Sequence, residues 1–91
     1  MAAYSIFIKK SAARELEGLA KKDLRKVLER IEALGENPRP AGAEKLAGVE
    51  LWRIRQGNYR IVYAIEDDAL TVWIVKVGHR KEVYHKIKDE G

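Results

Sequence analysis

The 91-residue sequence contains no cysteine and no long apolar stretch. Without cysteine the chain forms no disulfide, no thiolate zinc site and no cysteine nucleophile, so we expect a cytoplasmic location. The apolar stretch at residues 4–8 is much shorter than the roughly 18 residues of a membrane-spanning helix, and it is too short for a secretory signal. We therefore expect neither a membrane partner nor export.

Several signatures of catalytic sites are also missing. The sequence has no glycine-rich phosphate loop, no GxSxG nucleophile elbow and no carboxylate pair placed for glycoside hydrolysis. Asp67 and Asp68 belong to a turn sequence, and no further carboxylates or histidines are spaced around them to complete a coordination shell. We therefore expect no metal ion and no cofactor, which disfavours metal-dependent nuclease chemistry.

The charge is positive and unevenly distributed. Eighteen Lys and Arg residues against 14 Asp and Glu residues give a net charge of +4. The cations concentrate in the C-terminal half, which includes an acid-free stretch with Arg53, Arg55 and Arg60. The length fits a single domain at residues 1–91. We expect this domain to present one surface to a polyanion, either a nucleic acid or an acidic protein.

The periodicity of the first 35 residues predicts a strand followed by two helices. Residues 4–8 alternate as a strand does, and Ser11 is a candidate N-cap for a short first helix. The second helix has an apolar stripe at helical spacing, formed by Leu24, Val27, Leu28, Ile31 and Leu34. Gly35 is placed where a helix of this kind ends.

The rest of the chain predicts a sheet. Three segments rich in β-branched and aromatic residues, separated by turn sequences, lie at residues 51–55, 59–65 and 70–77. The order of elements predicts an α+β domain. In this domain the helical pair packs on one face of an antiparallel sheet that contains a three-stranded meander. Residues 81–88 are either a short helix or a tail.

A two-residue turn at Gly57 and Asn58 would place Arg55 opposite Arg60. Arg53, Arg55 and Arg60 would then share the face of the sheet away from the helices. Like charges directly across two strands destabilise a sheet by up to about 1 kcal/mol, so folding alone does not select them. They indicate an anion site, whereas a face charged only for solubility would include acids. A longer turn would change these pairs.

The same register predicts pairs between the next two strands. Ile65 would lie opposite Leu70, and Val62 opposite Trp73. Val62, Trp73 and Val75 would then form an apolar floor on the arginine face, where we expect Trp73 to pack rather than to stack on a base.

Polar and aromatic residues follow the last predicted strand, after Gly78. Arg80 is interpreted as a fork that binds phosphate rather than as an ordinary surface charge. His79 either transfers a proton or satisfies a loop backbone group. Tyr84 either stacks on a nucleobase or covers the edge of the core.

Two motifs carry a resemblance to a known family. The sequences Tyr-Arg-Ile-Val-Tyr at 59–63 and Gly-His-Arg-Lys-Glu-Val-Tyr at 78–84 resemble the RelE toxins of bacterial and archaeal toxin–antitoxin pairs. The first motif is shared with the ParE branch, which poisons DNA gyrase, and the second is closer to RelE. The resemblance implies a RelE-like fold and a metal-independent, ribosome-dependent endonuclease that cleaves mRNA in the ribosomal A site.

The resemblance also implies binding partners for the chain and leaves alternatives to this function. A cognate antitoxin would neutralise the chain, and operator DNA would be bound only through the antitoxin complex. Two other functions stay open: a ParE-like DNA gyrase inhibitor, and an inactive module that retains only antitoxin binding and co-repression.

The resemblance assigns roles to five residues: Arg53, Arg55, Arg60 and Arg80 as catalytic cations, and Tyr84 as the stacking side chain. The best-known relatives carry lysines at the first two positions, one of them in a general-base role, whereas arginine does not lose its proton in proteins. The base that accepts the proton of the ribose 2′-hydroxyl is therefore unassigned. Either His79 helps, or the arginines act only through their charge.

Overall fold

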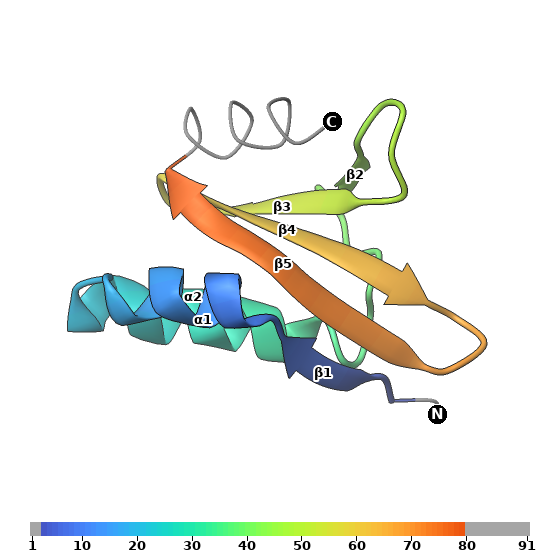
Figure 1. Cartoon of the computed structure of the whole chain (residues 1–91), viewed down its shortest axis with the longest axis horizontal. Helices are drawn as coiled ribbons and strands as arrows, with labels where there is room; N and C mark the ends of the chain where they lie inside the picture. The colour runs from blue at the N-terminus through green and yellow to red at the C-terminus, as the bar shows by residue number, and fades with distance from the viewer. Residues whose placement is uncertain (1–2, 80–91) are drawn as a thin grey trace.

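A computed structural model describes residues 3–79 of the chain (Figure 1). Its elements follow in the order β1 (Ser5–Ile8), α1 (Lys10–Glu17), α2 (Lys21–Ala33), β2 (Glu44–Lys45), β3 (Trp52–Gln56), β4 (Tyr59–Glu66) and β5 (Thr71–His79). The five strands form one sheet in the order β1-β5-β4-β3-β2. The predicted α+β class is confirmed, and residues 81–88 lie outside the described part of the chain.

The sheet is mixed, so the prediction of an antiparallel sheet is wrong for its first strand. β1 runs parallel to β5, from Ser5 opposite Thr71 to Ile8 opposite Ile74, whereas the other neighbours are antiparallel. β5 ends the meander, and its outer edge offers unpaired backbone groups that β1 satisfies. The short strand β2, which pairs with β3, was not predicted, because two residues are too few to show a period.

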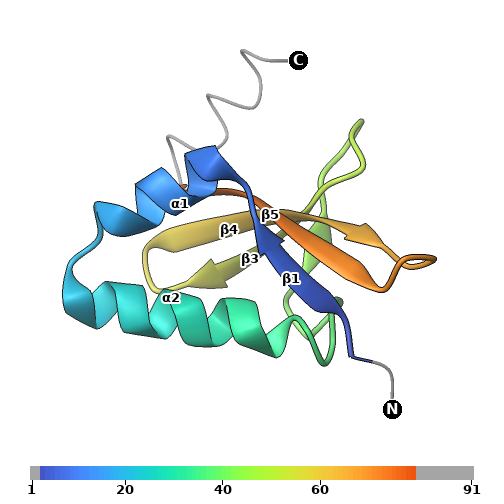
Figure 2. The same cartoon turned by 60° about the horizontal axis from the view of Figure 1, so that its bottom comes forward.

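Both helices lie on the same side of the sheet (Figure 2). Val27, Ile31 and Leu34 of the predicted stripe are buried in the core against strand residues such as Ile54, Ile61 and Ile74. Burying a side chain of this size contributes about 1.5–3 kcal/mol. Leu28 differs from the prediction, because its side chain is exposed.

The ends of the helices are set by contacts with β1 and β5. Lys9, not the predicted Ser11, is the N-cap of α1, and its backbone N–H donates to the carbonyl of Ile74. Strand pairing thus continues up to the first residue of the helix. Gly35 follows α2 as predicted, and a Cβ there would lie 3.1 Å from the carbonyl oxygen of Tyr4. The close approach of β1 therefore favours glycine here, because a Cβ would fit only if the backbone of β1 shifted slightly.

The hairpin between β3 and β4 is confirmed. The pairs include Arg55 opposite Arg60 and Trp52 opposite Tyr63, and Gly57 has a φ of +61°. A two-residue hairpin turn needs such a left-handed residue, which glycine adopts without strain. The register of this hairpin decides which side chains of β3 and β4 face away from the helices.

The predicted register between β4 and β5 is wrong. Ile65 lies opposite Val72, and Val62 lies opposite Lys76, with an irregularity between Val62 and Tyr63. The turn between these strands has the predicted length of four residues but lies one residue further along the chain, at residues 67–70, and includes Leu70 at a φ of +48°. Trp73 nevertheless stays on the side that was predicted, because it lies opposite Ala64, two residues along the strand from Val62.

The outer edge of β5 is closed beyond the end of β1 by a side chain from α1. One carboxylate oxygen of Glu15 accepts a hydrogen bond from the backbone N–H of Val77 at 3.0 Å. The other forms an ion pair with the ammonium group of Lys76, also at 3.0 Å. Glu15 therefore takes the place of a neighbouring strand and fixes α1 to the end of the sheet.

A cluster of polar contacts holds the loop after α2 against the turn between β4 and β5. The Arg39 guanidinium donates to both carboxylate oxygens of Asp67, at 3.1 and 2.8 Å, and lies over the Trp52 ring. The Tyr4 hydroxyl donates to the same carboxylate at 2.7 Å. These hydrogen bonds, with that from Arg39 the strongest, lower the pKa of Asp67 from 3.8 to about 2.

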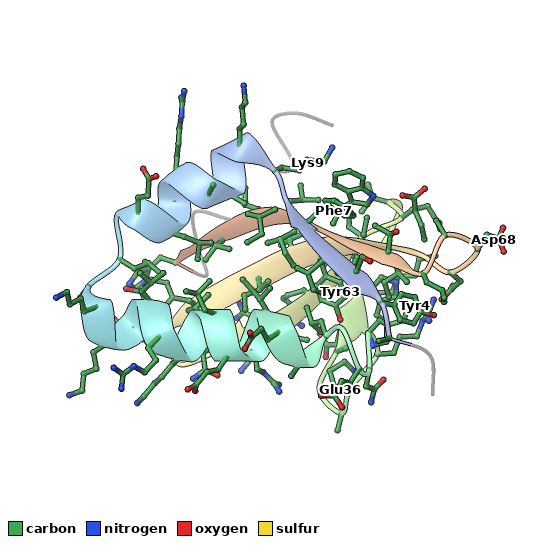
Figure 3. The ribbon with its side chains drawn as sticks, turned by 90° about the horizontal axis from the view of Figure 1, so that it is seen from below. Tyr4, Phe7, Lys9, Glu36, Tyr63 and Asp68 are labelled. Carbon is green, nitrogen blue, oxygen red and sulfur yellow. The ribbon has the colours of Figure 1, made fainter. Side chains whose placement is uncertain are left out.

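We expect Asp67 to contribute to the acid sensitivity of the fold. Its depressed pKa means that the contribution is complete above pH about 4 and is lost as the pH falls towards 2. Asp67→Asn should therefore reduce the drop in Tm over this range, measured by circular dichroism melts. Asp68→Asn, in the same turn (Figure 3), is the matched control and should behave like the unaltered chain. Equal drops in the Asp67 variant and the unaltered chain would contradict the assignment.

Candidate functional site

The side of the sheet away from the helices carries the three predicted arginines. Side chains alternate between the two faces along a strand. Ile54 and Ile61 pack in the core under the helices, so Arg53, Arg55 and Arg60 point to the opposite side. The structure therefore brings these three residues onto one face, which we call the arginine face. Val62 lies among them and is fully buried without belonging to the helix-side core.

The three arginines differ in their surroundings. Arg53 and Arg60 are each only 7% exposed, whereas Arg55 is exposed. The backbone carbonyl of Arg55 accepts a hydrogen bond from the Arg30 side chain of α2, which ties the end of the hairpin to the helical layer. Arg55 therefore has a fixed backbone and an accessible guanidinium group.

A carboxylate also belongs to the arginine face. Glu44 lies opposite Arg53 in the pairing of β2 with β3, and the two side chains form an ion pair. The Glu44 side chain is 65% exposed, so it is accessible from solvent while Arg53 fixes its position. Sequence reasoning missed Glu44. An acidic residue shortly before the arginine-bearing strand could have indicated this role, but the sequence predicted no strand at Glu44.

His79 is separated from the arginine face. Its ring contacts that of Tyr59 edge-on, with centroids 5.3 Å apart. Tyr59 packs against the helix-side core, and the residue opposite Arg60 is Gly78. Strand alternation thus turns His79 towards α2, beside a cleft of about 390 Å³ that Asp23 and Tyr59 also line. The Tyr59 hydroxyl donates to the Asp23 carboxylate at 3.2 Å, and burial together with this bond raises the pKa of Tyr59.

The remaining predicted site residues, Arg80 and Tyr84, lie outside the described part of the chain. Within residues 3–79, no three histidine, aspartate or glutamate side chains gather as metal ligands would. Neither helix of that part is long and apolar enough to cross a membrane. The three arginines of the arginine face are permanently charged, and the Glu44 carboxylate lies beside Arg53.

Comparisons with known proteins agree with this architecture. A family model described as the ParE toxin of the type II toxin–antitoxin system parDE matches residues 6–84. Toxin RelG of Mycobacterium tuberculosis is 32% identical over 87 residues, which cover 91% of this chain and 98% of RelG.

Solved structures show the same fold. The toxin–antitoxin complex RelBE2 of Mycobacterium tuberculosis contains a chain similar to this one, with a TM-score of 0.80 and 29% identity over 87% of this chain and 93% of that chain. The archaeal RelE–RelB complex of Pyrococcus horikoshii gives a TM-score of 0.77 and 30% identity over 86% and 96%. The fold and the family match define a toxin of the RelE and ParE type. The chain belongs to the ParE toxin family of type II toxin–antitoxin systems, and its relatives include RelE-named toxins.

We expect the Arg55 side chain to contribute to ligand binding and not to the stability of the fold. Arg55→Gln removes a cation that lies opposite Arg60, so the free energy of unfolding should be unchanged or should rise by up to about 1 kcal/mol. Arg53→Gln is the matched comparison. It breaks the ion pair with Glu44 at a buried position and should lower that free energy by about 1–3 kcal/mol. Urea denaturation measures both, and a large loss of stability in the Arg55 variant would contradict this expectation.

Proposed function

We propose that the chain is a metal-independent endoribonuclease that cleaves mRNA in the ribosomal A site and thereby inhibits translation. The observation that carries the proposal is that Arg53, Arg55 and Arg60 share the face of the sheet away from α1 and α2, with the Glu44 carboxylate beside Arg53. The similarity to RelE-named toxins supports it. The proposed target places the activity in the cytoplasm.

The arrangement suits cleavage by a neighbouring ribose hydroxyl. The 2′-oxygen attacks the adjacent phosphorus, and the bond from phosphorus to the 5′-oxygen of the next nucleotide breaks. The leaving 5′-oxygen takes a proton from solvent, and the products are a 2′,3′-cyclic phosphate and a 5′-hydroxyl. Negative charge grows on the phosphate oxygens in the transition state, and fixed guanidinium groups stabilise it. A single preorganised donor of this kind contributes about 3–4 kcal/mol.

The proton of the 2′-hydroxyl needs an acceptor, which arginine does not provide. Glu44 is the carboxylate next to Arg53, and we assign the acceptor role to it in this proposal. The orientation of His79 towards Tyr59 and α2 favours Glu44 over the histidine. In the proposal Arg80 contributes a further cation, and Tyr84 stacks on a base of the mRNA.

We expect the exposed arginine to be essential for cleavage. Primer extension on a translated message after induction should show cuts inside codons for the intact chain. Arg55→Ala should reduce them by about 100-fold or more, because it removes one preorganised donor. Arg25→Ala, an equal change of charge at an exposed position on α2, is the control and should leave the cuts unchanged. Arg80→Ala should also abolish the cuts. Full cleavage by the Arg55 variant would overturn the proposed site.

We expect Glu44, and not His79, to accept the proton. In a ribosome cleavage assay, Glu44→Gln should slow the reaction at every pH and remove the rise in rate that accompanies ionisation of a carboxyl group. Glu44→Asp should retain part of the rate. His79→Ala should leave both the rate and its pH dependence unchanged. A normal pH profile in Glu44→Gln would show that the carboxylate is not the acceptor.

The solved RelBE2 and RelE–RelB structures are toxin–antitoxin complexes, which supports a cognate antitoxin as the neutralising partner of this chain. Binding of operator DNA would then occur only through that complex. The parDE description of the matching family favours a second candidate, inhibition of DNA gyrase. A gyrase inhibitor needs no catalytic cations, so Arg55→Ala would remain toxic when expressed without antitoxin. Harmless growth with the intact chain would instead indicate an inactive co-repressor module.

A further inference from the structure

The side of the sheet away from α1 and α2 carries a second feature, at the edge formed by β1. Phe7 lies beside Trp73 in the parallel pairing of β1 with β5, and their rings are stacked with centroids 5.0 Å apart and planes 27° apart. Trp73 lies opposite Ala64, and alternation along β4 puts Ala64 on the same side as Arg60. The two rings therefore extend the arginine face towards the edge strand. We call Phe7 and Trp73 the aromatic platform.

The aromatic platform is rigid and open. The indole Nε1–H of Trp73 donates to a carboxylate oxygen of Glu66 at 2.6 Å, which fixes the ring, and Phe7 packs against that ring. Phe7 is nevertheless 49% exposed. An edge strand is usually protected by charged side chains, so a half-exposed phenylalanine here is not explained by folding. An aromatic surface held in advance loses little entropy when a flat ligand stacks on it.

The charges around the aromatic platform identify the kind of ligand. The Lys9 ammonium lies 5.7 Å from the centre of the Trp73 ring, and the arginines occupy the other end of the same face. Ala64 is four residues from Arg60 along β4, which corresponds to about 13 Å. Surfaces that bind single-stranded nucleic acid typically combine cations along the path of the sugar–phosphate backbone with aromatic side chains on which the bases stack.

We propose that the aromatic platform stacks an unpaired nucleobase of the same RNA strand whose phosphate the arginines hold, with Lys9 close to a backbone phosphate. This inference rests on the proposed function and adds a second contact to it. The stack is tolerant of base identity, because every base offers a π face. The platform thus orients the RNA strand on the sheet rather than selecting its sequence. Figure 3 shows Phe7 and Lys9 together beside β1, on the side away from α2.

Binding of a fluorescent single-stranded RNA oligomer, followed by anisotropy at low salt, tests the inference. Phe7→Ala should weaken binding by about 5- to 100-fold, the range for loss of one stacked base. The slope of log affinity against log salt should not change. Phe7→Tyr should bind like the intact chain, and Phe7→Leu should bind weakly, because leucine keeps the apolar surface without the ring. Lys9→Gln should reduce the salt slope by about 0.7, the value for one lost phosphate contact on a single strand.

The controls separate this site from the proposed cleavage. Val49→Ala shortens another exposed apolar side chain and should bind normally, and circular dichroism should confirm that each variant folds. Normal binding by Phe7→Ala, or equal binding by Phe7→Leu and the intact chain, would overturn the inference. Failure of the intact chain to bind the oligomer would also contradict the inference. The ribosome assay tests cleavage separately. Stacking that depends on Phe7 in a chain that cleaves no message would support the platform and refute the nuclease.

Discussion

The two-residue turn at Gly57 fixes the side of the sheet to which every residue of β3 and β4 points. A shift of one residue in the pairing would turn β3 over relative to β4, moving Ile54 into solvent and Arg53 and Arg55 under the helices. The apolar residues prevent such a shift, because their burial stabilises only one register. The same turn that organises the core therefore also holds Arg53, Arg55 and Arg60 together on the opposite face.

Hydrogen bonds elsewhere in the fold stabilise it despite this concentration of charge. Tyr63 is buried at the centre of β4 and donates to the Pro38 carbonyl at 2.7 Å, and burial raises the pKa of its hydroxyl to about 12. Glu15 closes the edge of β5 by accepting from the Val77 N–H. These contacts lie on the helix side or at the edges of the sheet. They stabilise the fold from outside the arginine face, which binds the ligand in the proposed function.

The sequence was sufficient to predict the parts of the fold that depend on local patterns. A glycine at a two-residue turn predicted the pairing of Arg55 with Arg60, and helical spacing predicted the burial of Val27 and Ile31. Features set by contacts between distant segments could not be predicted. The parallel pairing of β1 depends on the free edge of β5, and the register of β5 depends on the conformation of its turn. Glu44 was missed for the same reason, since only pairing with β3 brings it to Arg53.

The resemblance to RelE toxins implies lysine at two positions where this chain has arginine, and this difference has a physical consequence for the proposed chemistry. A lysine at the site can stabilise charge and also, when its pKa is depressed, accept a proton, so one residue combines two roles. Arginine keeps its charge at every physiological pH and therefore serves only the phosphate. The proton must then go to a different kind of group, and the pairing of β2 with β3 places a carboxylate beside the first arginine. In the proposed reaction the short strand β2 thus supplies, through Glu44, the proton acceptor that the arginines cannot provide.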